Sequence, residues 1–597
     1  MQPPGNIVFG ARDKEAFVTV KKVSGSDRGS IGIAITGSGG AGAMTAGNML
    51  LEAAAKAGWY GLMVRSSGPQ IRGGEAAALL RIATHPIDGL ADHFDVLIAI
   101  DWQNVHRFAD EILLEPSSLV VGDPDQGEAP EVYLKSGARK VDLPMKQMAK
   151  AIKGSWPNMV ALGLAAGLIG LPAEAVKKVV SGSLKKAGDA LPASLAAVDA
   201  GIDAARKIGY EARLASPAAG APPRWLISGN QAAGYGAVRG GVRFVAAYPI
   251  TPATEMLEWL SPALADVGGV LVQAEDELAS INMIIGASFG GVPALTATSG
   301  PGLSLMTEAL GLACAAEVPI VVVDVMRGGP STGIPAKSEQ SDVSIAVSGL
   351  HGDAPRIVVA PNSVADCLTT TQWAVHLAES LQAPAIVLSD QFFGQTRAVV
   401  NRPADVSYAG QRLTAAAGAE GYKRYALTES GVSPMAIPGT PGVAYTADGL
   451  EHNEWAIPSS GARDHGAQLA KREKKLRLHD FGSQWADVEG EGDIAVVTFG
   501  SCTGPAREAL ARAANEGIRA KLVSLRLLAP LQVDRLAGAL AGVTRVLVVE
   551  QNQSGQLLKY LRSEVDLPGE VASLRHPGPL PIRADEIHRQ ILEWSHA

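Results

Sequence analysis

The chain has 597 residues, so at the ~150 residues of a typical domain about three or four domains are expected. Apolar residues make up 47% and charged residues 19%, with a net charge of −8. These values exclude wholesale disorder and the broad basic surface that nucleic acid requires. The longest apolar run, 159–171, is too short for a spanning helix, and the amino terminus has no signal pattern, so we expect a soluble, cytoplasmic protein without membrane contact.

The cysteines Cys314, Cys367 and Cys502 stand far apart in the sequence, and no Cys-x-x-Cys pair occurs. This spacing argues against a disulfide framework and against a sequence-local zinc or iron–sulfur site. We therefore predict no metal site in this chain.

Apolar runs alternate with helical patterns along most of the chain, which predicts an α/β fold with three parallel-sheet domains. The first block, residues 1–213, has expected strands at 31–36, 61–65, 96–100 and 118–121, a helix at 43–57, and helical patterns through the rest. A Pro-rich linker follows at 214–223.

The second block, 224–402, has expected strands at 270–273, 292–298, 320–325, 356–359 and 385–388. An irregular connector with one basic helix near 467–478 is expected at 403–490. The third block, 491–597, has expected strands at 494–499, 520–524 and 546–550.

A glycine-rich loop joins the first strand to the first helix. Backbone N–H groups at a helix start can hold a phosphate such as that of coenzyme A, although the glycines also suit tight packing alone. A nicotinamide site would need an acid at the end of the second strand, where the chain has Arg65, so NAD is disfavoured. The candidate phosphate-binding residues are Gly37, Gly39, Gly40, Gly42 and, in a second glycine loop, Arg72.

Four polar loops follow strands of the second block. Their sequences are YPITP (248–252), QAEDE (273–277), TATSGPG (296–302) and RGGPSTG (327–333). The carboxyl ends of parallel strands meet at one edge of a sheet, so these loops predict a binding site. Glu275 and Asp276 also suit the simpler role of helix-start acids.

These loops, with PAKSEQ (335–340) and HGD (351–353), resemble the α subunit of 2-oxoacid:ferredoxin oxidoreductases, most closely the 2-oxoglutarate branch in which a γ-like domain precedes the α chain. The resemblance covers nearly the whole sequence in order. It implies a γ-like first domain, a thiamine-pyrimidine-binding second domain, and a transketolase C-terminal-like third domain with Glu550-Gln551-Asn552 at a strand end. Ala336 is a departure, because the family usually has Thr there.

The resemblance assigns roles to particular residues. Glu277 would place a carboxyl group on the pyrimidine nitrogen of thiamine diphosphate, which supports the imino form that activates the cofactor. Arg327 and Thr251 would bind the 2-oxoacid carboxylate, and Lys337 is our candidate for the distal carboxylate of 2-oxoglutarate. The further residues predicted to contact the cofactor are Tyr248, Pro249, Ile250, Ser299 and Gly300.

The Gly-Asp-Gly…Asn motif that binds magnesium and diphosphate in thiamine enzymes cannot be found in this chain. By resemblance this half-site and a [4Fe–4S] cluster lie on a separate β subunit, ferredoxin accepts the electrons, coenzyme A accepts the acyl group, and the assembly is (αβ)2. Two alternatives stay open: another substrate, such as a branched-chain or aromatic 2-oxoacid, and a non-catalytic nucleotide-binding regulatory subunit.

Overall fold

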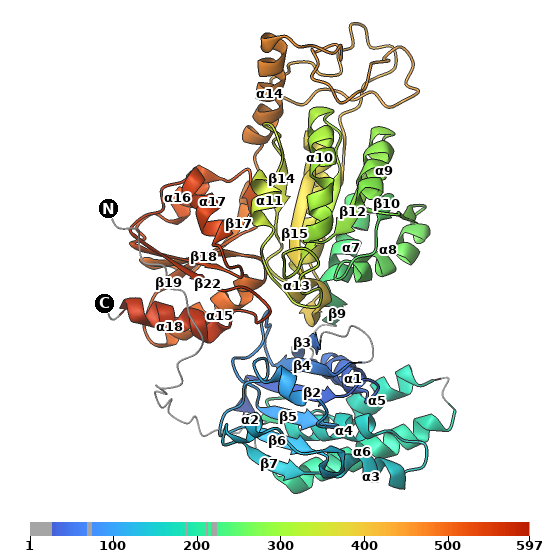
Figure 1. The fold of residues 1–597 in the computed structure, drawn as a ribbon, viewed down its shortest axis with the longest axis vertical. Coiled ribbons are helices and arrows are strands. Elements are labelled where there is room, and N and C mark those ends of the chain that lie inside the picture. The colour runs from blue at the N-terminus through green and yellow to red at the C-terminus, as the bar shows by residue number, and fades with distance from the viewer. Residues whose placement is uncertain (1–26, 69–73, 186–187, 211–212, 217–223, 596–597) are drawn as a thin grey trace.

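The computed structural model describes residues 27–68, 74–185, 188–210, 213–216 and 224–595. Three large sheets with flanking helices make up the fold, together with a two-stranded pair of β1 (Asp27–Arg28) and β8 (Arg213–Leu214). Figure 1 shows the first sheet below, the middle sheet above it, and the third sheet beside the middle one. The predicted α/β class with three sheet domains is confirmed. Among the described residues no helix has both the length and the apolar character needed to cross a membrane.

The first sheet has eight strands in the order β7-β6-β5-β2-β4-β3-β16-β9. The pairs from β7 to β2 are parallel, whereas those from β2 to β9 are antiparallel, which the sequence did not indicate. Side chains alternate along β2, so Ile31, Ile33 and Ile35 face a core built with α1 and α4, while Ala34 faces the core shared with the middle sheet. The elements are β2 (Ser30–Gly37), α1 (Ala43–Lys56), β3 (Tyr60–Ser67), β4 (Ala76–Ala83), β5 (Val96–Ala99), η1 (Val105–Phe108), β6 (Leu119–Gly122), η2 (Pro124–Gln126), α2 (Glu131–Leu134), β7 (Arg139–Asp142), α3 (Met145–Ala151), α4 (Pro157–Ile169), α5 (Ala173–Ser183), α6 (Ala190–Ile208), β9 (Arg224–Ser228) and β16 (Arg397–Asn401).

Two strands at the ends of the second block, β9 and β16, pair with the first sheet. The chain therefore leaves the first sheet into the middle domain through β9 and returns to it through β16. β4 and β7 lie in stretches where we expected helix. The Ala-rich β4 is a strand because it fills the space between β2 and β3, so its backbone groups are paired on both sides.

The middle sheet has the order β11-β10-β12-β13-β15-β14-β20, with every pair parallel except β14 with β20. Its central strands are wholly buried, as expected for a parallel sheet covered on both faces. The elements are α7 (Gly229–Gly240), β10 (Phe244–Ala247), α8 (Thr254–Asp266), β11 (Val270–Gln273), α9 (Glu277–Phe289), β12 (Ala294–Thr298), α10 (Gly300–Ala315), β13 (Val321–Met326), α11 (Val343–Ser348), β14 (Ile357–Val359), α12 (Asp366–Leu381), β15 (Ala385–Asp390), α13 (Gln391–Gln395) and β20 (Leu527–Ala529).

The third sheet has the order β17-β19-β18-β21-β22 and is parallel except for β17. The connector before it is largely irregular and ends with the basic helix, which begins at Ala462, five residues before the predicted start. The elements are α14 (Ala462–Arg477), η3 (Gly482–Trp485), β17 (Ala486–Glu489), β18 (Ile494–Phe499), η4 (Gly500–Cys502), α15 (Thr503–Asn515), β19 (Ala520–Leu525), α16 (Val533–Ala539), β21 (Arg545–Glu550), α17 (Gln556–Glu564), β22 (Glu570–Arg575) and α18 (Ala584–Ser595).

A buried ion cluster fixes the connector to the middle domain. Glu317, at the end of α10, is fully buried, and its carboxylate accepts hydrogen bonds from Lys471 at 2.5 and 2.7 Å and from Lys475 at 2.9 Å. Burial raises the pKa of Glu317, but the charges of the two lysines and of Arg424 outweigh it and hold the pKa below its usual range. The predicted basic helix α14 is thus basic partly because it neutralises a core acid.

Candidate active site

The four polar loops meet at the carboxyl edge of the middle sheet. They follow β10, β11, β12 and β13, which are consecutive neighbours in the sheet and run parallel. A parallel sheet places the ends of its strands together, so the loops converge although they span about eighty residues of sequence.

Glu277 is the first residue of α9, and its side chain is buried, with 7% exposed. Asp276 supplies the N-cap, because its carboxylate accepts a hydrogen bond from the Ala279 backbone N–H at 2.7 Å. Glu275 is exposed. Asp276 thus has the helix-start role that the sequence left open, and the cap turns Glu277 inward.

The Glu277 carboxyl group packs against the first turn of α10. A Cβ atom on Gly302 would lie 2.8 Å from Glu277 Oε1 and 2.0 Å from Thr298 Oγ1, so only glycine fits there. Within the described part of the chain no hydrogen-bond donor reaches this carboxylate. A buried acid without a donor is available to a ligand nitrogen at this edge.

Arg327 and Thr251 are brought together. Arg327 is 6% exposed, and one of its terminal nitrogens donates to the Thr251 carbonyl oxygen. Its Nε atom has no hydrogen-bond partner among the described residues. Burial lowers the pKa of Arg327, while the charges of Asp342, Asp324 and Glu277 oppose that shift. Arginine keeps its charge under such conditions, so a cation with an unused donor lies close to Glu277.

The sequence interpretation missed a pair of acids beside Arg327. The Asp324 carboxyl group is buried close enough to Asp342 for the two charges to repel, and neither of its oxygens has a hydrogen-bond partner among the described residues. Two neighbouring buried carboxyl groups resist ionising together. Burial raises the pKa of Asp342 to about 7 and that of Asp324 well above its usual range. The signal was present, because Asp324 interrupts the apolar run of β13.

The Asp342 carboxylate lies against the start of α10, where a Cβ on Gly300 would be 2.7 Å from both of its oxygens. Ser299, the N-cap residue of α10, is fully buried, and its hydroxyl has no hydrogen-bond partner in the part of the chain that the structure describes. The first turn of α10 is therefore lined on one side by Glu277 and on the other by Asp342.

The Lys337 side chain contacts residues of the first domain. Its Nζ atom lies 2.6 Å from Glu111 Oε1 and 2.8 Å from Ser66 Oγ, and its side chain is 15% exposed. A small hollow of about 30 Å³ lies beside it, lined also by Arg65, Ala336 and residues of the third domain. To bind a substrate carboxylate, Lys337 would have to leave Glu111.

Tyr248 is 40% exposed, and Pro249 and Ile250 are half-buried next to it at the end of β10. Other large apolar side chains on the loops and helices of the site are also exposed by at least 40%. Apolar side chains gathered on one edge are typical of a protein–protein contact. They are Leu278 and Met283 on α9, Leu305 on α10, and Ile334 in the loop after Arg327.

The glycine loop of the first sheet holds a carboxylate from its own chain. Asp101 accepts hydrogen bonds from the Ser38 backbone N–H at 2.9 and 3.1 Å and from the Ser38 hydroxyl at 2.8 Å. A Cβ on Gly37 would lie 2.8 Å from Ala41, and one on Gly42 would lie 2.4 Å from Asn158. These contacts favour the packing role of the loop, since a phosphate would meet the Asp101 charge.

Two further candidates of that loop, Gly39 and Gly40, are exposed, and a Cβ on Gly40 would meet nothing within 4 Å. Arg72, the other predicted phosphate ligand, lies outside the described residues.

Family models match the chain in three segments. Residues 32–204 match "Pyruvate ferredoxin/flavodoxin oxidoreductase", 235–471 match "Pyruvate flavodoxin/ferredoxin oxidoreductase, thiamine diP-bdg", and 484–557 match "Transketolase, C-terminal domain". The segments agree with the three sheets, and the middle one carries the site described above.

Known proteins match over most of the chain. The α subunit of 2-oxoacid:ferredoxin oxidoreductase 2 of Aeropyrum pernix is 30% identical over 90% of this chain and 93% of its own. The 2-oxoglutarate oxidoreductase subunit KorA of Mycobacterium tuberculosis is 34% identical over 73% of this chain and 67% of its own.

The chain also matches a solved structure, the 2-oxoglutarate:ferredoxin oxidoreductase of Magnetococcus marinus with 2-oxoglutarate, coenzyme A and succinyl-CoA bound. The two sequences are 37% identical, and the match covers 95% of this chain and 100% of that chain with a TM-score of 0.88. The resemblance seen in the sequence motifs is confirmed. The chain belongs to the family of 2-oxoacid:ferredoxin oxidoreductase α subunits.

Proposed function

We propose that this chain is the α subunit of a coenzyme A-acylating 2-oxoglutarate:ferredoxin oxidoreductase. The reaction converts 2-oxoglutarate, coenzyme A and oxidised ferredoxin into succinyl-CoA, carbon dioxide and reduced ferredoxin. The observation that carries the proposal is the buried Glu277 side chain, which accepts no hydrogen bond from the described residues and faces the same edge as Arg327 and Thr251. The substrate assignment is supported by the 2-oxoglutarate enzymes among the relatives.

The residues of this edge suit the pyrimidine half of thiamine diphosphate. When bound, the cofactor supplies a nucleophilic carbon that attacks the 2-oxoacid carbonyl group. Glu277 would hold a proton shared with the pyrimidine nitrogen, because a buried carboxyl group is well placed to hydrogen-bond a ring nitrogen. The absence of a side chain at Gly302 leaves room for the carboxyl group, and Ser299 and Gly300 form the adjoining wall.

Arg327 and Thr251 would hold the carboxylate next to the carbonyl group of the substrate. The guanidinium group has an unused donor, and a charge-assisted bond is about twice as strong as a neutral one. For the distal carboxylate of 2-oxoglutarate we retain Lys337, which would break its ion pair with Glu111 and form one with the substrate. Coenzyme A is proposed as the acyl acceptor, but the Asp101 contacts give no reason to place its phosphates at the glycine loop.

A β subunit would supply the diphosphate and magnesium site and the [4Fe–4S] cluster, in a cytoplasmic (αβ)2 assembly that delivers electrons to ferredoxin. The exposed apolar side chains around the site support this part of the proposal, because a partner covering them would also close the edge from water. Covering this edge would bury Leu278 and Leu305 on the elements that hold Glu277 and Ser299.

The test is a dye-reduction assay on the co-purified α and β chains with a panel of 2-oxoacids. We expect 2-oxoglutarate to be preferred, and preference for a branched-chain or aromatic acid would replace the substrate assignment. Glu277→Gln should lower kcat by roughly 10²–10⁴-fold with thiamine diphosphate still bound. The matched control is Glu275→Gln, an exposed acid two residues away, which should keep normal turnover.

Exchange of the C2 proton of the bound cofactor in deuterated buffer separates this chemistry from binding. Wild-type exchange in Glu277→Gln would show that another carboxylate acts. A holo-complex with no 2-oxoacid turnover at all would favour the regulatory-subunit alternative.

A further inference from the structure

The loop that carries Arg327 has few contacts of its own. Residues 329–334 are exposed, and within the loop the Gly328 N–H donates to the Lys337 carbonyl oxygen at 3.0 Å and the Ile334 N–H donates to that of Gly328 at 2.8 Å. A loop of this kind takes its position from the points where its ends are held. One end is β13, and the other is Lys337, which is bonded to Glu111 and Ser66, together with the following segment 338–341.

Gln340 anchors that segment and is fully buried. Its Nε2 atom donates to the Phe499 carbonyl oxygen at 3.0 Å, and its Oε1 atom accepts from the Gln551 N–H at 2.9 Å. Its own backbone N–H donates to the Gln551 carbonyl oxygen at 2.8 Å. Backbone and side chain of Gln340 are therefore both bonded to the third domain.

The partners of this segment come from the strand-ending motif of β21. Gln551 Nε2 donates to the Ser338 carbonyl oxygen at 3.1 Å, and Asn552 Nδ2 donates to the Gln340 carbonyl oxygen at 3.1 Å. Gln551 and Asn552 are each 1% exposed. Glu550 fixes Asn552 in turn, because its carboxylate accepts from Asn552 Nδ2 at 2.6 Å.

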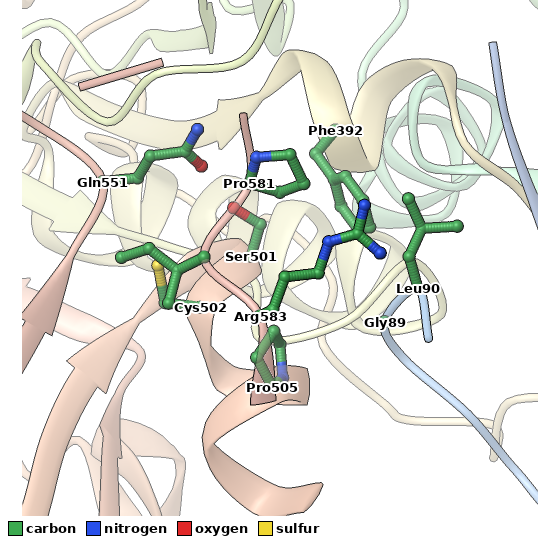
Figure 2. A pocket seen from close by; sticks show the side chains of 10 residues that line it. Gly89, Leu90, Phe392, Ser501, Cys502, Pro505, Gln551, Pro581 and Arg583 are labelled. Carbon is green, nitrogen blue, oxygen red and sulfur yellow. The ribbon is translucent and has the colours of Figure 1, made fainter. Parts of the chain in front are cut away.

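Gln551 lies at a junction of the domains. It lines a cavity of about 10 Å³ together with Leu90 of the first domain, Phe392 of the middle domain, and Ser501 of the third. Figure 2 shows these side chains around the cavity. Because the interior leaves little free space, a substitution at Gln551 alters the packing of the residues around it.

We propose that Gln551, Asn552 and Gln340 are positioning residues that clamp the loop 327–337 and so preset Arg327 for the 2-oxoacid carboxylate. The proposal rests on the proposed function. In this proposal the third domain contributes to catalysis without contacting the reacting atoms, because the Gln551 and Asn552 amides at the end of β21 hold the far end of the substrate-binding loop.

The test compares Gln551→Ala with Gln532→Ala in the assembled α and β chains. Gln532 is a matched control, because its amide also donates to a backbone carbonyl oxygen of the third domain, that of Pro530, at 3.2 Å. Gln551→Ala loses bonds to Ser338 and Leu580, so we expect KM for 2-oxoglutarate to rise about tenfold, with a smaller change in kcat and unchanged C2-proton exchange. Gln532→Ala should leave KM unchanged.

Limited trypsin digestion of the full chain gives a second measurement that needs no substrate. Cleavage after Lys337 should be faster in Gln551→Ala than in wild type or Gln532→Ala, because the clamp no longer holds the adjoining Ser338. If Gln551→Ala does not fold, Gln340→Asn takes its place, because the shorter amide would lose its bonds to the Phe499 carbonyl oxygen and the Gln551 N–H on the loop side of the clamp.

Unchanged KM and unchanged cleavage in a folded clamp variant would overturn the proposal. A complex that turns over no 2-oxoacid would reject the proposed function, and the digestion would still decide whether the clamp exists.

Discussion

Gly302→Ala tests whether the position of Glu277 determines turnover. The added Cβ would lie 2.0 Å from Thr298 Oγ1, 2.7 Å from Glu277 Cγ and 2.8 Å from Glu277 Oε1, whereas ordinary contacts begin at 3.4 Å, so both side chains would be displaced. The carboxyl group must therefore move by at least about 0.6 Å. Overpacking of this kind costs about 1–3 kcal/mol of stability. A misplacement of ~1 Å at a reacting group can cost ~10²-fold, so we expect kcat to fall roughly ten- to a hundredfold.

The assay is dye reduction by the assembled α and β chains, with thermal unfolding measured on the same preparations. Gly286→Ala is the matched control, because it lies in the adjoining helix α9 and its added Cβ meets nothing within 4 Å. That change should raise stability by about 0.5–1 kcal/mol, since alanine favours helix, and leave kcat unchanged. Normal kcat in Gly302→Ala, or loss of stability without loss of kcat, would refute the link between this contact and turnover.

Four further outcomes are expected. Burial raises the pKa of Asp342 from its ordinary value near 4 to about 7. Because the folded chain favours the protonated form, the free energy of unfolding should fall as the pH rises between these values. In Asp342→Asn the free energy of unfolding should depend less on pH over the same range. Glu317→Gln leaves Lys471 buried without its counter-charge and should lower the free energy of unfolding by about 3–5 kcal/mol, measured with denaturant. A decrease below about 1 kcal/mol would mean that water reaches the cluster and solvates the lysine. Lys337→Ala should raise KM for 2-oxoglutarate on the order of tenfold and leave KM for pyruvate unchanged. Equal effects on the two substrates would mean that Lys337 serves only to bind the loop to the first sheet. The α chain purified alone should contain no stoichiometric iron or acid-labile sulfide, because its cysteines are buried and far apart in sequence.

Local sequence predicted most of the elements that hold the site. The strands 270–273 and 494–499 have the predicted bounds, because a short apolar run between turn residues indicates a strand both at the partly exposed edge of a sheet and in its buried centre. The four loops could be placed at one edge, since parallel strands in one sheet end together. Glu277, Arg327 and Thr251 were singled out by family motifs, and the structure places them at that edge.

The local sequence pattern could not predict contacts between residues that lie far apart in the chain. Asp342 stands beside Asp324 and Gly300 only because the chain folds back over the start of α10. The pairing of Lys337 with Glu111 joins residues 226 positions apart, and neither local periodicity nor charge pattern indicates a partner at such a distance.

The sequence alone determined the α/β class, the order of the three domains, the family and the strand-end residues, because each depends on local periodicity or on a contiguous motif. The tertiary structure decided that β9 and β16 join the first sheet, that Asp101 accepts hydrogen bonds from Ser38 in the glycine loop, and that the Gln551 amide donates to the Ser338 carbonyl oxygen. Backbone and side-chain donors take whichever acceptor the packed chain brings within reach, and only the folded geometry determines which one that is.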